Sequence, residues 1–114
     1  MKEIKAYVRR EQLTAVVAQL EQAGVSGISI TEIHPVGYGY EPEYFRLGPE
    51  DVFHQHPQTM AKIELVCSSG KVQQFVEMIR DNAKTGYRGD GIIFVSPIEH
   101  ARRIRDDAVD HEAL

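Results

Sequence analysis

The stretch TGYRGDGIIF, Thr85–Phe94, decides how the rest of the sequence is interpreted. It places three glycines, an arginine and an aspartate directly before a run of apolar residues. Glycine allows positive φ and a close approach of the backbone to a ligand, and clustered backbone N–H groups bind anions such as phosphate. The apolar run predicts a short buried strand that holds the loop still. From this stretch alone, a phosphate-binding loop and an ordinary turn both remain open.

Three arginines, Arg102, Arg103 and Arg105, follow this strand closely in the sequence. Guanidinium groups recognise phosphate and carboxylate through paired N–H donors. Together with the glycine loop, they predict a polyanion site. The alternative is that they form only a solvated, charged surface.

The composition indicates one globular domain in a reducing compartment. The chain has 114 residues, of which 42% are hydrophobic and 26% are charged. Its formal net charge of −4 argues against general nucleic-acid binding, which needs a basic face. The single cysteine, Cys67, excludes an internal disulfide. No signal peptide or membrane-spanning stretch is recognised, so a cytoplasmic protein is expected.

Hydrophobic periodicity predicts four strands and two main helices along the chain. Apolar alternation predicts strands at 2–9, 25–36, 60–67 and 92–95, and the helical period predicts helices at 11–23 and 71–84. Gly24 is expected to end the first helix, and Ser68 or Ser69 to cap the second. A short helix is expected at 98–105, and the acidic tail at 106–114 is expected to be mobile.

The segment 37–59 is predicted to be a long exposed loop that orders on binding a partner. It holds three of the five tyrosines of the chain, Tyr38, Tyr40 and Tyr44, and three of its five prolines. No strand or helix period persists there, and structureless loops of this length are usually functional or disordered. Aromatic side chains anchor interfaces, so the tyrosines are candidates for partner binding. The other interpretation is that they pack on the protein's own surface.

This order of elements, βαββαβ, predicts an α+β, ferredoxin-like fold within a single domain, 1–114. Such a fold has a four-stranded antiparallel sheet with two helices on one face and the long loop between strands two and three. The other sheet face of so small a domain needs a cover. Packing of identical subunits, a homo-oligomer, is the simplest one.

Several motifs in order resemble the PII family of signal-transduction proteins. They are TGYRGDGIIFVSPIEHARRIR (Thr85–Arg105), the opening MKEIKAYVR and GVSGISITEI (Gly24–Ile33). The resemblance spans nearly the whole chain. It implies a homotrimer that binds ATP or ADP in clefts between subunits and contacts target proteins, such as transporters or enzymes, through the long loop. It also implies a regulator without catalytic residues.

Residue by residue, the resemblance implies a nucleotide site with contributions from several segments. Ser29 takes the place of a threonine near the adenine, Glu64 and Val66 match the strand that lines the base, and Gly37 matches the base of the loop. The phosphate contacts are implied at Gly89, Asp90, Gly91, Arg103 and Arg105. Arg88, inside the glycine loop, is a further candidate for contact with phosphate or bicarbonate.

Four positions depart from the family pattern, three of them (Ile92, Gly39 and Pro35) in the apparatus that handles Mg-ATP and 2-oxoglutarate. Ile92 stands where the family has a lysine that contacts the outer phosphates, and Gly39 where it has a ligand-coordinating glutamine. Pro35 replaces a glycine, and the tyrosine that some members modify falls near Asp51. These departures indicate a PII-like protein that binds ADP or AMP rather than ATP. Its relatives of this kind occur with bicarbonate-handling and carboxysome systems or with metal-efflux systems.

Three alternatives to this function remain open. The first is a metal-binding trimer that uses His54 and His56, although no cysteine pair or third ligand accompanies them and solvated loop histidines are the simpler interpretation. The second is conventional nitrogen regulation. The third is a structural adaptor whose loop docks regardless of nucleotide.

Overall fold

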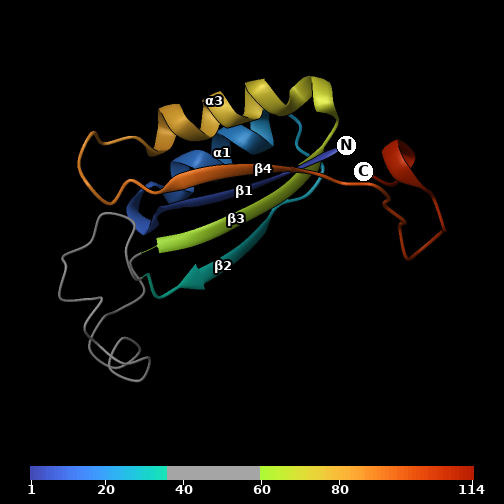
Figure 1. Ribbon diagram of the computed structural model, residues 1–114, viewed down its shortest axis with the longest axis horizontal. Helices are drawn as coiled ribbons and strands as arrows, with labels where there is room; N and C mark the ends of the chain where they lie inside the picture. The colour runs from blue at the N-terminus through green and yellow to red at the C-terminus, as the bar shows by residue number, and fades with distance from the viewer. Residues whose placement is uncertain (36–59) are drawn as a thin grey trace.

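The computed structural model describes residues 1–35 and 60–114, which form one sheet covered on one face by two helices (Figure 1). The strands are β1 (Lys2–Arg9), β2 (Ser29–Ile33), β3 (Met60–Cys67) and β4 (Ile92–Pro97), and the helices are α1 (Leu13–Gln22) and α3 (Val72–Ala83). Short 3₁₀ turns occupy Arg10–Gln12, Ser69–Lys71 and Asp110–Ala113.

The sheet is antiparallel throughout, with the strand order β2-β3-β1-β4. The two central strands are the first and third in the sequence, and each helix connects a central strand to an outer strand on the same sheet. This is the predicted ferredoxin-like arrangement, which is therefore confirmed. Lys2 lies opposite Cys67 on one side and Pro97 on the other, so one end of the sheet holds the N-terminus and the end of β4.

The core lies between the sheet and the helices. Alternate residues of the central strands point toward the helices and are buried, as the period of two predicts for a half-buried strand. The buried cluster comprises Ile4, Ala6 and Val8 of β1, Ile63, Leu65 and Cys67 of β3, Val16 and Leu20 of α1, and Phe75, Ile79 and Ala83 of α3. Cys67 is thus a small core residue with a free thiol, as expected.

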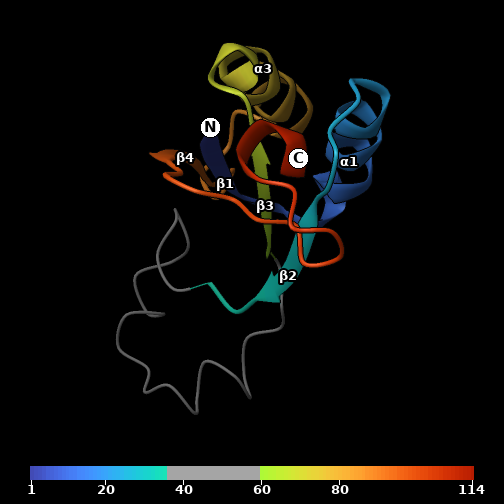
Figure 2. The ribbon, with the colours of Figure 1, turned by 90° about the vertical axis from the view of Figure 1, so that its right-hand side faces the viewer.

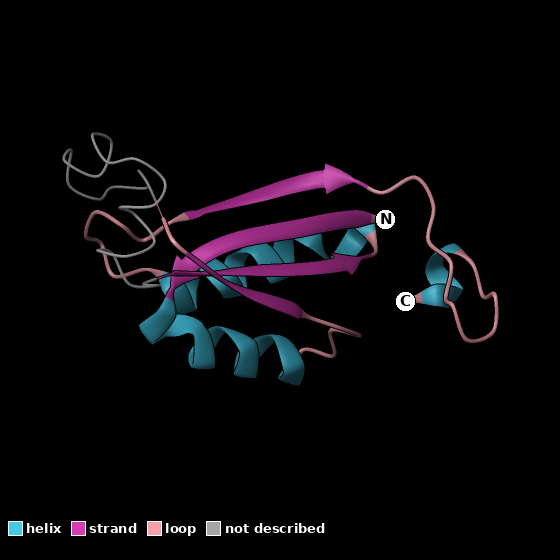
Figure 3. Cartoon of the chain, turned by 90° about the horizontal axis from the view of Figure 1, so that it is seen from below, coloured by secondary structure: helices cyan, strands magenta, loops and turns pink. Residues whose placement is uncertain are grey.

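The opposite face of the sheet is bare of helices (Figure 3). It carries the other set of alternating residues, including Lys5, Tyr7 and Phe94. The rings of Tyr7 and Phe94 meet edge to face, with centroids 6.2 Å apart. Phe94 is still 49% exposed, so this face presents an apolar surface at its β4 side.

The end of α1 follows the sequence prediction, and the start of α3 does not. Gly24 has φ 84°, its N–H donates to Glu21, and the next N–H, of Val25, donates to Leu20, which is the hydrogen-bond pattern of a Schellman motif. The predicted capping role of Ser68 or Ser69 is wrong. A 3₁₀ turn with Ser68 at its N-cap precedes α3, whose own N-cap is Lys71. Neither side chain makes a capping hydrogen bond.

The segment after β4 also differs from the prediction. No helix forms at 98–105; instead, Arg102 pairs with Val109 across a tight turn. The backbone of Arg103 donates to Ala108 at 2.8 Å, and the 3₁₀ turn at Asp110–Ala113 brings the chain back. The tail predicted to be mobile is therefore a hydrogen-bonded C-terminal hairpin, residues 101–114. Side chain–backbone bonds at its acids stabilise this hairpin, and no hydrophobic period predicts it.

Candidate functional site

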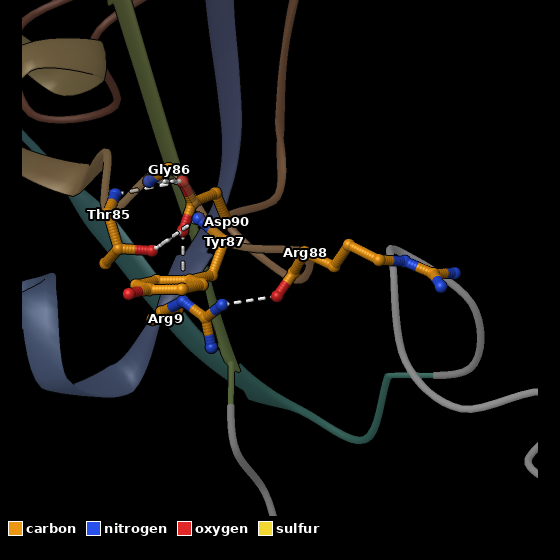
Figure 4. A network of polar contacts seen from close by, with 6 residues as sticks. All are labelled: Arg9, Thr85, Gly86, Tyr87, Arg88 and Asp90. Atoms are coloured by element: carbon orange, nitrogen blue, oxygen red, sulfur yellow. Dashed lines mark hydrogen bonds and ion pairs between the residues drawn. The ribbon is translucent and has the colours of Figure 1, made fainter.

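The glycine loop between α3 and β4 is held together by one carboxylate. Asp90 accepts hydrogen bonds from the backbone N–H groups of Thr85 and Gly86, at 2.9 and 2.8 Å, and from the hydroxyl of Thr85 (Figure 4). It also forms an ion pair with Arg9, at 3.1 Å. Asp90 thus satisfies the first N–H groups of the loop with an anion from the chain itself.

These donors keep Asp90 ionised. The hydrogen bond from the Thr85 hydroxyl, followed by the N–H groups of Gly86 and Thr85 and by Arg9, holds the pKa of Asp90 far below its usual range. Arg9 also donates to the carbonyl oxygen of Arg88, which fixes the tip of the loop. The side chain of Arg88 extends away from this network (Figure 4).

Two glycines of the loop are required by its geometry. Gly89 and Gly91 have φ values of 96° and 97°, a region that side-chain-bearing residues rarely adopt. A Cβ at Gly91 would also overlap the backbone carbonyl of Tyr7. The loop therefore passes directly against β1 as it enters β4.

A second group of the predicted residues converges on a cleft elsewhere in the molecule. Ser29 of β2, Glu64 and Val66 of β3, and Arg103 of the C-terminal hairpin line a cleft of about 530 Å³. Ser29 and Glu64 are direct partners in the strand register. The remaining lining residues are Glu3, Ser26, Gly27, Leu65, Ala113 and Leu114. A cleft of this size suits a small-molecule ligand.

Two charged residues of this cleft lining, Glu64 and Arg103, form ion pairs within the chain. Glu64 forms an ion pair with Lys62 at 2.9 Å, and the hydrogen bond from Lys62 lowers the pKa of Glu64. Arg103 donates through Nε to Asp106 at 2.9 Å and through Nη2 to the carbonyl oxygen of Glu112 at 3.1 Å. Arg105 lies outside the cleft lining, and its side chain is 79% exposed.

The two groups of predicted residues lie along different parts of the sheet: Glu64 and Val66 of the cleft lie opposite Lys5 and Glu3 of β1. The glycine loop packs on Tyr7, whereas Arg103 follows Pro97, which lies opposite Lys2. Five residue steps of β1 separate Lys2 from Tyr7, which is about 17 Å at 3.3 Å per residue. Figure 1 shows the loop and the C-terminal hairpin on opposite sides of the fold. One chain therefore does not bring all the predicted contacts to one small ligand.

The other predicted residues are outside the part of the chain that the structure describes. They are Gly37, Tyr38, Tyr40, Tyr44, His54 and His56. Among residues 1–35 and 60–114 there is no group of three His, Cys, Asp or Glu side chains able to hold a metal ion. Within the same residues, no helix has the length and apolar character of a membrane span.

Sequence reasoning missed three residues that shape these regions: Arg9, Thr85 and Asp106. The contact of Arg9 with Asp90 spans 81 positions of the sequence, and no local pattern signals it. Asp106 stands three residues after Arg103, within the tail that the sequence predicts to be mobile. The spacing of three residues between an arginine and an acid is the sequence signal that could have indicated this ion pair.

Comparisons with known proteins match all or nearly all of the chain. A family model described as Nitrogen regulatory protein P-II matches residues 1–108. A Nitrogen regulatory protein P-II of Rhizobium etli is 38% identical, with 100% of both chains covered. Proteins of the same description from Cereibacter sphaeroides and Synechocystis are 34% and 32% identical, also over 100% of each chain.

Proposed function

The chain belongs to the PII (P-II) family of nitrogen regulatory proteins, and from this membership we propose that it is a homotrimeric regulator that binds an adenine nucleotide between subunits. ADP or AMP is the favoured ligand over ATP. Nucleotide binding would then control a transporter or enzyme through the segment 37–59, where Tyr38, Tyr40 and Tyr44 are the proposed contacts.

The observation that carries this proposal is the separation of the candidate site into two halves. Ser29, Glu64 and Arg103 line one cleft, whereas the glycine loop packs on Tyr7 and contributes no residue to the lining of that cleft. A nucleotide that uses both halves requires the cleft of one subunit and the loop of its neighbour. The apolar surface around Phe94, on the helix-free face, supports a subunit interface there.

The preference for a shorter nucleotide rests on the end of the glycine loop. Ile92 directly follows Gly91 at the start of β4, and it is 43% exposed. An isoleucine at this place offers no charge or hydrogen-bond donor to an outer phosphate. Triphosphate would therefore gain less here than in a relative with a lysine.

The names of the relatives favour a second candidate, conventional nitrogen regulation. That function would require ATP and 2-oxoglutarate to bind together. The first candidate instead places the protein in carbon or bicarbonate metabolism, with bicarbonate as a further ligand. Both are regulatory functions and need no catalytic residue.

Isothermal titration of the trimer with AMP, ADP and ATP, with and without 2-oxoglutarate and bicarbonate, tests the proposal. We expect ADP or AMP to bind more tightly than ATP, without a gain from 2-oxoglutarate. Tight ATP binding that 2-oxoglutarate strengthens would establish the second candidate instead. Absence of binding by all three nucleotides would overturn both.

Arg103→Ala is the site variant for the same titration. Loss of a charge-assisted contact costs about 1.5–3 kcal/mol, so nucleotide affinity should fall at least about tenfold. Arg105→Ala should weaken binding less, because this side chain lies outside the cleft lining. A change below about twofold for both variants would contradict the assignment of the phosphate contacts.

A further inference from the structure

The guanidinium group of Arg103, which lines the cleft, already binds a carboxylate of the same chain, that of Asp106. The Nε of Arg103 donates to Oδ1 of Asp106 at 2.9 Å, which is the geometry of a charge-assisted hydrogen bond. Arg105 lies 3.7 Å from the other oxygen of the same carboxylate. Asp106 therefore stands beside both arginines that are proposed to bind phosphate.

Asp106 is fixed in this position by the turn that contains it. Its Oδ1 accepts from the backbone N–H of Ala108 at 3.1 Å. The turn is closed by two backbone bonds, from Arg103 to Ala108 and from Asp107 to Arg103. Asp107 has φ 59°, so the chain reverses sharply just after the carboxylate. Asp106 is thus part of a built turn, which distinguishes it from a freely rotating surface acid.

The ion pair of Arg103 with Asp106 is exposed enough for a ligand to displace it. The side chains of Arg103 and Asp106 are 37% and 42% exposed. Ion pairs at this exposure are screened by water and contribute little to stability. A phosphate that approaches Arg103 must break or share this pair, and it meets the negative charge of Asp106 at close range.

We propose that Asp106 is a specificity-determining residue, an internal anion that limits how strongly the cleft binds phosphate and that disfavours ligands with more phosphate charge. This inference rests on the proposed nucleotide site. It adds a second reason for a preference against triphosphate, separate from Ile92. The competing interpretation is that Asp106 only stabilises the C-terminal hairpin.

Asp106→Asn separates these two roles. Asparagine keeps the size of the side chain and the oxygen that accepts from Ala108, so the turn is preserved while the charge is removed. The matched control is Asp81→Asn, which removes a charge from an Arg–Asp pair of similar length, 3.0 Å to Arg80, on the exposed side of α3. Titration with AMP, ADP and ATP, at low and high salt, compares the three proteins.

We expect Asp106→Asn to bind ADP about two- to fivefold more tightly than the wild type, because an exposed charge pair no longer competes. The gain should grow from AMP to ADP to ATP and should shrink at high salt. Asp81→Asn should match the wild type. In an Arg103→Ala background, the gain from Asp106→Asn should become smaller, because the occupied guanidinium is absent.

The outcomes distinguish this inference from the proposed function. If the wild type binds ADP and Asp106→Asn binds it with equal or lower affinity, Asp106 is only a hairpin residue and the nucleotide site stands. An equal gain for all three nucleotides, or the same gain in Asp81→Asn, also overturns the inference. If no nucleotide binds to any of the proteins, the proposed function fails, and this inference fails with it.

Discussion

Ile92 is the residue whose replacement most directly tests ligand choice. It follows the glycine loop at the start of β4 and is 43% exposed, so a longer side chain has room at this position. We expect Ile92→Lys to raise the affinity for ATP at least about fivefold, since a charge-assisted contact to phosphate contributes more than 1 kcal/mol.

The control for this variant is Ile92→Gln, which has similar polarity and length without the charge. Titration with ATP and AMP measures both variants. AMP affinity should change little in either, because the lysine is expected to act on the outer phosphates. A lysine variant that strengthens AMP and ATP equally would show that position 92 does not select phosphate number.

The ionisation of Asp90 should make the stability of the protein depend on pH. The Thr85 hydroxyl, the loop N–H groups and Arg9 hold its pKa well below the usual range. A group whose pKa is depressed by folding stabilises the native state above its unfolded pKa, which is about 3.9 for aspartate. This stabilisation is present at neutral pH and is lost as the pH falls below about 4 toward the folded value.

Urea denaturation at several pH values between neutral and 3 measures this effect. Wild-type stability should decline on acidification more steeply than that of Asp90→Asn, which lacks the titrating group. Asp81→Asn, at an exposed pair with 61% and 64% exposed side chains, should follow the wild-type curve. Parallel curves for wild type and Asp90→Asn would show that the loop does not depend on this charge.

At the scale of elements, the junction of the glycine loop with β4 depends on close backbone packing. Gly91→Ala would place a Cβ against the carbonyl of Tyr7 at a φ of 97°. Gly24→Ala, at the end of α1, has a φ of 84° but meets no atom within 4 Å. The second substitution therefore measures the cost of the left-handed backbone alone, about 1–2 kcal/mol.

We expect Gly91→Ala to destabilise the protein by clearly more than Gly24→Ala, because backbone overlap adds to the strain. Chemical denaturation of both variants gives the difference in the free energy of unfolding. Gly91→Ala should also weaken nucleotide binding by displacing the loop, and Gly24→Ala should not. Equal destabilisation would mean that the junction relaxes around the added methyl group.

Elements with a strong hydrophobic period were predictable from the sequence, and those held by polar contacts were not. The predicted strands at 2–9 and 60–67 have the observed bounds, since their alternation reflects burial against the helices. Of the described residues in the strand predicted at 25–36, only Ser29–Ile33 form β2, and Val25 still belongs to the helix-ending motif. The C-terminal hairpin depends on side chain–backbone bonds that leave no such period.

The sequence indicated several residues that the structure brings together, but it did not indicate their contacts. Family motifs indicated Ser29, Glu64, Val66 and Arg103, and the structure brings these four to one cleft. The same motifs did not show that Arg103 is paired with Asp106. Asp106 belongs to the tail that the sequence predicts to be mobile, and a mobile residue is not expected to hold a fixed contact. The contact of Arg9 with Asp90 depends on which strands are neighbours, and a local pattern does not contain this information.

At the scale of the whole molecule, oligomer formation and ligand binding should be one process. The glycine loop and the C-terminal hairpin that carries Arg103 lie on opposite sides of the fold (Figure 1), and the helix-free face of the sheet exposes Phe94 and Ile92 (Figure 2 shows α1 and α3 on the other face). A ligand that contacts two subunits stabilises their association by mass action. Dilution below the dissociation constant of the trimer should therefore weaken nucleotide binding.

Phe94→Glu tests this coupling, because it places a charge on the apolar part of the helix-free face without touching the cleft lining. Burial of an unpaired carboxylate in an interface is strongly unfavourable, so sedimentation velocity should show monomers at concentrations where the wild type is a trimer. Gln74→Glu, on the exposed side of α3, adds the same charge to the other face and should leave the trimer intact. The monomeric variant should retain its circular dichroism spectrum and lose ADP binding, although Ser29, Glu64 and Arg103 are unchanged. A folded Phe94→Glu monomer that still binds ADP at wild-type affinity would show that one chain holds the complete site and that no neighbouring subunit contributes to it.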